Sequence, residues 1–145
     1  INARSIGVEL VNPGHEFGYR DFTDDQMAAL KDLALDILAR HPIPARNVVG
    51  HSDVAPRRKT DPGELFDWAG LAEAGVGLWP GGAEAAEADQ DQVLEWLRAY
   101  GYDTAEGPQA ISAFQRHFRP LMVTGTADPE TCSLIDHVAT LAASP

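Results

Sequence analysis

The stretch GHSDVAPRRKTDPG, residues 50–63, carries the strongest structural and chemical signal in this chain. It places the imidazole of His51 ten residues before the carboxylate of Asp61, with Lys59 two residues before that carboxylate. An apolar run, residues 43–49, leads into it, and Pro62 and Gly63 close it with a turn signal. Zinc binds neutral imidazole nitrogen and carboxylate oxygen. The spacing therefore predicts one side of a zinc site with a cationic group beside it.

The chemistry of such a site is specific. Bound zinc would lower the pKa of its water towards about 7 and polarise a carbonyl group. Glu9 stands inside a predicted strand, so its carboxylate is a candidate general base for that water. Lys59 could stabilise negative charge developing on the carbonyl oxygen. A catalytic zinc usually keeps three protein ligands, however, and only His51 and Asp61 are visible here.

The simpler interpretation of each residue stays open at this point. A histidine next to a glycine is often a surface residue, an aspartate before proline often a turn residue, and Lys59 could be solvated charge. Among the other histidines, only His15 lies near Glu9 in the sequence.

Residues 1–80 predict an α/β domain. The alternation in SIGVELV, residues 5–11, is typical of a strand that ends at Asn12-Pro13-Gly14. Thr23 and Gln26 form a capping-box pattern before an apolar stripe at helical spacing. This helix should end before His41-Pro42, and a second short strand is expected over 47–50. The order strand, helix, strand favours a mixed sheet flanked by helices.

The second part of the chain predicts a separate helical unit. A helical pattern over residues 64–74 closes the first domain, and residues 81–88 are small and acidic, which indicates a linker. Three short amphipathic helices are expected within residues 89–145, the second opening at Gly107-Pro108 and the third at Asp128-Pro129.

Composition excludes several classes of protein. The net charge is −11, with 22 acidic against 11 basic residues, so we expect no nucleic acid as a partner. No apolar run approaches the roughly 18 residues that cross a bilayer, so we expect no membrane-spanning segment. Cys132 is the only cysteine, which excludes an internal disulfide and favours a small buried side chain.

Residues 5–10 and 50–63 together resemble the zinc-dependent N-acetylmuramoyl-L-alanine amidases of the AmpD and AmiD type, the amidase-2 family. The resemblance implies hydrolysis of the amide between N-acetylmuramic acid and L-alanine in peptidoglycan or muropeptides. It implies His51 and Asp61 as Zn²⁺ ligands, Glu9 as the acid that activates water and Lys59 as the residue that stabilises the transition state. Arg58 and Asn12 are implied as substrate contacts.

The family also has a third zinc ligand, a histidine on a strand well before the position of Glu9. We therefore expect that histidine, and the N-terminal part of the catalytic domain, outside this chain, with the N-terminal fragment of the same enzyme as a partner. Residues 89–145 resemble a three-helix peptidoglycan-binding domain, through GYD at 101–103, AISAFQRHF at 110–118 and GTAD at 125–128.

A wall-binding unit favours action on intact peptidoglycan and a periplasmic or wall-associated location. The alternative is a non-catalytic peptidoglycan-binding or recognition protein with an incomplete metal site. An enzyme of the same fold from a phage is a third option.

Overall fold

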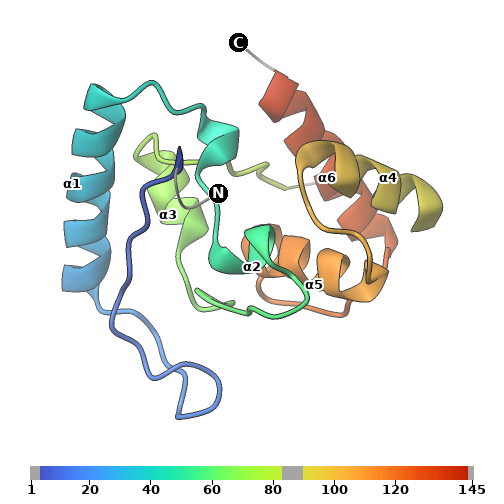
Figure 1. Ribbon diagram of the computed structural model, residues 1–145, viewed down its shortest axis with the longest axis horizontal. Coiled ribbons are helices and arrows are strands. Elements are labelled where there is room, and N and C mark those ends of the chain that lie inside the picture. Colours follow the sequence, from blue (N-terminus) through green and yellow to red (C-terminus); the bar gives the residue numbers. More distant parts are fainter. Residues whose placement is uncertain (1–3, 83–89, 144–145) are drawn as a thin grey trace.

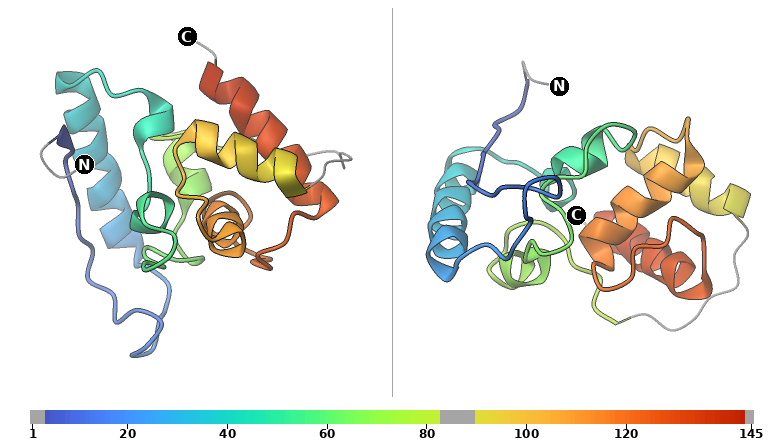
Figure 2. Two further views of the ribbon diagram at one scale, coloured as in Figure 1. Left: turned by 45° about the vertical axis from the view of Figure 1, so that its right-hand side comes forward. Right: turned by 90° about the horizontal axis from the view of Figure 1, so that it is seen from below.

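The computed structural model describes residues 4–82 and 90–143, and within them the regular elements are all helical (Figure 1). Figures 1 and 2 show α1 and the α4–α6 group on opposite sides of a middle region that holds α2 and α3. The elements are α1 Asp24–Arg40, the 3₁₀ turn η2 Ala45–Asn47, α2 His51–Val54, α3 Trp68–Glu73, α4 Gln90–Tyr100, α5 Gly107–Phe118 and α6 Pro129–Ala143.

The prediction of an α/β fold with a mixed sheet is wrong for the described residues, which contain no strand. Residues 5–11 run without regular structure, and Ile6 is 54% and Val11 87% exposed. Residues 45–47 form a 3₁₀ turn where the second strand was expected to begin. Alternating side chains define two faces, but a strand also needs a neighbouring backbone to pair with, and residues 5–11 have none in the described part of the chain.

The first predicted helix is confirmed, together with its cap. The Thr23 hydroxyl accepts from the Gln26 amide at 3.2 Å, and the Gln26 side chain accepts from the Thr23 amide at 3.0 Å. This exchange satisfies two amides that the helix itself leaves free. The inward side of α1 packs on a small core beside α3; the core residues are Phe66, Trp68, Leu71 and Val76, and the helix residues against them are Met27, Leu30, Ala34 and Leu38. Leu33 belongs to the predicted apolar stripe but is 44% exposed.

The three helices expected after residue 89 are present and share a second core. Leu97, Ile111 and Phe114 are fully buried between α4, α5 and α6. Cys132 is buried, as its apolar setting predicts. The expected linker lies, from residue 83 on, outside the described residues. None of the described helices is long and apolar enough to cross a membrane.

Candidate metal-binding site

His51 and Asp61, ten residues apart in the sequence, lie side by side. His51 Nδ1 is 3.0 Å from Asp61 Oδ2, and their side chains are 45% and 60% exposed. A backbone bond brings the two segments together, because the Ser52 amide donates to the Asp61 carbonyl at 2.9 Å. His51 is the first residue of α2, so its direction is set by the start of that helix.

Two glycines allow this close approach. A Cβ on Gly50 would come within 2.8 Å of Pro62 Cδ and 3.3 Å of the Trp68 ring. Gly63 has φ +88°, and its missing Cβ would meet the phenol of Tyr19. The Tyr19 hydroxyl donates to the Pro62 carbonyl at 2.7 Å and accepts from the Leu65 amide at 2.9 Å. The loop that carries Asp61 is thus fixed from both sides, since only glycine fits where the backbone turns.

The donors present fit zinc in kind, being one imidazole nitrogen and one carboxylate oxygen with solvent access. Their number is short of a catalytic set: residues 4–82 and 90–143 hold no group of three histidine, cysteine or acidic side chains placed to share a metal ion. This part of the molecule therefore offers two candidate donor side chains, both partly exposed to solvent.

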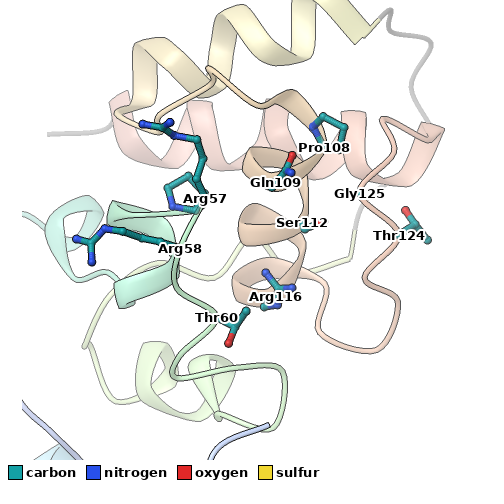
Figure 3. A pocket seen from close by; sticks show the side chains of 10 residues that line it. Arg57, Arg58, Thr60, Pro108, Gln109, Ser112, Arg116, Thr124 and Gly125 are labelled. Atoms are coloured by element: carbon teal, nitrogen blue, oxygen red, sulfur yellow. The ribbon is translucent and has the colours of Figure 1, made fainter. Parts of the chain in front are cut away.

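Among the described residues, no hydrogen bond or ion pair joins the remaining residues of the predicted site to this pair. Glu9 is exposed on the irregular segment 5–11, and among the described residues no hydrogen bond or ion pair joins it to His51 or Asp61. Lys59 is half-buried, and its backbone amide bonds the Ala55 carbonyl at 3.0 Å. Arg58 is exposed, and Figure 3 shows its guanidinium pointing away from α5.

The side chain of Asn12 makes hydrogen bonds within its own loop. Its side-chain amide donates to the Arg20 carbonyl at 2.7 Å, and its side-chain oxygen accepts from the Gly14 amide at 3.1 Å. These bonds occupy both ends of the side chain that the resemblance implies as a substrate contact.

His15 lies close to the loop of the predicted metal ligand. Its Nε2 is 3.0 Å from a Glu64 oxygen, its Nδ1 is 3.4 Å from the Thr60 hydroxyl, and its ring stacks on Tyr19. Partial burial raises the pKa of Glu64, but the hydrogen bond with His15, a backbone hydrogen bond and the nearby charges of His15 and Arg116 together outweigh it, so the net pKa is lowered. Glu64 therefore remains a carboxylate beside this loop at neutral pH.

Two hollows meet next to the loop of Asp61. One, of about 400 Å³, is lined from the loop by Pro56, Arg57, Arg58 and Thr60, and from the C-terminal unit by Pro108, Gln109, Ser112, Arg116, Thr124 and Gly125 (Figure 3). The other, of about 370 Å³, is lined by His15, Thr60, Glu64, Arg116, Pro120 and Val123. Thr60 and Arg116 line both, so the hollows are contiguous and the C-terminal unit forms one wall.

Sequence reasoning missed a buried polar cluster beneath the site. Asp53, two residues after His51, is 5% exposed. Its Oδ2 accepts from the Gly50 amide at 2.7 Å and lies 2.8 Å from His117 Nδ1; its Oδ1 accepts from the Tyr102 hydroxyl at 2.8 Å. Burial and then the nearby Asp53 charge raise the pKa of Tyr102 well above its usual value, so this hydroxyl keeps its proton. The signal available in the sequence was a third polar group in the GHSD motif.

Comparison with known proteins relates this geometry to a family. Residues 1–64 match the N-acetylmuramoyl-L-alanine amidase family. N-acetylmuramoyl-L-alanine amidase AmiD of Escherichia coli is 41% identical over 157 residues, covering 94% of this chain and 57% of AmiD. The 1,6-anhydro-N-acetylmuramyl-L-alanine amidase AmpD of Enterobacter cloacae is 43% identical over 68 residues, covering 47% of this chain and 34% of AmpD.

Solved structures agree with these matches. Escherichia coli AmiD, in complex with the substrate anhydro-N-acetylmuramic acid-L-Ala-D-γ-Glu-L-Lys, superposes with a TM-score of 0.78 at 40% identity, over 85% of this chain and 54% of that one. Pseudomonas aeruginosa AmpDh3 superposes with a TM-score of 0.71 at 37% identity, over 86% and 56%. The chain thus spans little more than half the length of AmiD.

Proposed function

We propose that this chain, whose first 64 residues match the N-acetylmuramoyl-L-alanine amidase family, is part of an enzyme that hydrolyses the amide between N-acetylmuramic acid and L-alanine in peptidoglycan. The observation that carries the proposal is the pairing of His51 and Asp61 at 3.0 Å, within the matched region. A purely adhesive protein has no need of an open imidazole–carboxylate pair.

His51 and Asp61 would hold zinc, through ring nitrogen and carboxylate oxygen respectively. When bound, zinc would supply an activated water and polarise the scissile carbonyl. The Glu9 carboxylate would take the proton of that water, and the Lys59 ammonium would donate a hydrogen bond to the carbonyl oxygen as it gains charge. Arg58 and Asn12 would contact the substrate, Asn12 after its loop gives up a bond.

A third ligand, a histidine, would come from a segment outside these 145 residues. Two observations support this part of the proposal. The described residues supply only two donors, and apolar side chains of the irregular segment 5–11 stand in solvent, Val8 at 45% and Val11 at 87% exposure. An N-terminal fragment of the same enzyme that covers these side chains would bury apolar area and complete the ligand set.

The contiguous hollows beside the Asp61 loop would accept the stem peptide. The Arg116 side chain, which lines both hollows, has no ion pair or side-chain hydrogen bond among the described residues, and its charge helps to lower the pKa of Glu64. Thr60, Ser112 and Gln109 add polar groups along the same path. A stem peptide carries free carboxylates, and a guanidinium binds a carboxylate with two parallel hydrogen bonds. The substrate complex of the related AmiD, which holds a peptide of this kind, supports this choice of ligand.

The helical unit formed by α4, α5 and α6 would bind peptidoglycan and raise the local concentration of the scissile bond. This role favours a periplasmic or wall-associated location. The competing function is recognition of peptidoglycan without hydrolysis, and the short ligand set in the described residues is the observation that favours it.

One experiment separates these functions. Purified sacculi and an anhydro-muropeptide are incubated with the chain, alone and with the N-terminal segment, and zinc is measured in the same samples by mass spectrometry. We expect stoichiometric zinc and free peptides that begin with L-alanine only when the segment is present. Asp61→Ala should lose both zinc and activity, whereas Glu9→Ala should lose activity and keep zinc. Binding of sacculi without peptide release under every condition would establish the recognition protein instead.

A further inference from the structure

We propose that the C-terminal helical unit positions the metal-binding pair: Tyr102 and His117 hold the carboxylate of Asp53, and Asp53 holds the start of α2, where His51 stands. This inference rests on the proposed function of His51 as a ligand. It assigns the C-terminal unit a part in the catalytic centre, in addition to any contact with the cell wall.

The first step concerns the partners of Asp53. Its carboxylate is 5% exposed and cannot rely on water, so it needs donors from the protein. One donor is local, the Gly50 amide at 2.7 Å. The other two come from the C-terminal unit, the Tyr102 hydroxyl and His117 Nδ1, each at 2.8 Å. Two of the three hydrogen bonds that stabilise this buried carboxylate therefore come from residues distant in the sequence, Tyr102, which lies 49 residues after Asp53, and His117, which lies 64 residues after it.

The second step concerns how firmly His117 is held. Its side chain is 4% exposed, and its ring is stacked between Trp68, with centroids 3.9 Å apart, and Phe118, at 4.0 Å. Its Nε2 is buried with no hydrogen-bond partner in the described residues. The ring therefore donates an Nδ1 proton to Asp53, because an aspartate carboxylate can only accept. The stack and the carboxylate leave the ring a single orientation.

The third step connects Asp53 to His51. A helix of four residues, His51–Val54, is too short to be stable on its own. Its start is set by the bond from the Gly50 amide to Asp53, and its second residue by the bond from the Ser52 amide to the Asp61 carbonyl. His51 lies between these two bonds, so its backbone direction depends on both. When the donors from the C-terminal unit are removed, Asp53 must turn towards water and the start of α2 loses its cap.

Tyr102→Phe provides the test, because it removes only the hydroxyl that donates to Asp53. Tyr100→Phe is the matched control, because Tyr100 lies two residues before Tyr102 in the sequence and its ring stacks on that of Tyr102. The Tyr100 hydroxyl that this variant removes has no hydrogen-bond partner in the described residues. Both variants are made in the 145-residue chain, and thermal melting establishes that each is folded.

Two readouts are compared. Amide hydrogen exchange by NMR should be about tenfold faster at Gly50 and Ser52 in Tyr102→Phe, with Phe114 unchanged and with no change in Tyr100→Phe. Zinc affinity, measured with the N-terminal segment present by competition with a chromophoric chelator, should fall about three- to tenfold in Tyr102→Phe and stay unchanged in Tyr100→Phe. Global destabilisation would instead speed exchange at Phe114 as well.

Unchanged exchange at Gly50 and Ser52, or the same change in both variants, overturns the inference. So does faster exchange at the two amides with unaltered zinc affinity. If the wild-type chain binds no zinc under any condition, the proposed function of His51 loses its support. The exchange readout then still decides whether the C-terminal unit controls the start of α2.

Discussion

Gln115 offers a direct test of how the C-terminal unit is held together, because this fully buried amide has five hydrogen-bonding atoms around it. Its nitrogen shares two N–H groups among three acceptors, the Thr131 hydroxyl at 2.9 Å, the Thr126 carbonyl at 3.0 Å and the Thr124 hydroxyl at 3.2 Å. Its oxygen accepts from the amides of Thr124 and Gly125, both at 2.8 Å. One side chain of α5 thus fixes the loop that leads to α6.

Gln115→Leu keeps the approximate volume and removes all of these contacts. Two N–H donors and two accepted bonds amount to four full hydrogen bonds, so at about 1 kcal/mol net for each the loss would be about 4 kcal/mol. The loop is partly exposed, so water can replace some partners, and we expect about 2–4 kcal/mol of lost unfolding free energy. At roughly 2–4 °C per kcal/mol for a chain of this size, the melting temperature should fall by about 5–15 °C.

The assay is urea unfolding followed by circular dichroism, with thermal melting as a second measurement. Gln109→Leu is the control, since it makes the same change on the same helix at an exposed position and should stay within about 0.5 kcal/mol of wild type. Equal stability of the two variants would refute the reasoning that buried amide bonds hold this loop.

Single contacts support three further predictions. Burial raises the pKa of Asp128, but hydrogen bonds from Arg119 and Thr131 outweigh it, so the folded value is below the ordinary 3.8. This contribution to stability is therefore present above about pH 4 and lost as the pH falls through the folded pKa, and the deficit of Arg119→Gln in urea unfolding should shrink as the pH is lowered through that folded pKa. Thr23→Ala should cost about 1 kcal/mol in the same assay by removing the cap of α1; no loss there would mean that the cap contributes nothing. Gly63→Ala, at φ +88° and against the phenol of Tyr19, should cost more than about 1 kcal/mol and weaken zinc binding through the Asp61 loop; a stability equal to wild type would contradict the close approach.

The helices could be predicted from the sequence because their determinants are local. The Thr23–Gln26 cap, the Pro at Gly107-Pro108 and the apolar spacing in 110–118 act within a few residues, and the structure places helices there. The pairing of His51 with Asp61 was also within reach, because Pro and Gly restrict the ten-residue loop between and after them. Whether these two side chains and Glu9 perform the chemistry of an amidase stays a prediction.

Contacts between distant segments were beyond the sequence pattern. The alternation in residues 5–11 predicts a strand, yet a strand exists only where another backbone pairs with it, and no described segment does. In the sequence, Asp53 is one more polar residue of a loop. Only the tertiary structure shows that Tyr102 and His117, from the second half of the chain, contact its carboxylate. Local propensity and residue spacing were therefore enough to predict the helices and the candidate ligands. Burial depends on all neighbouring segments at once, so only the tertiary structure could show which polar groups support the site.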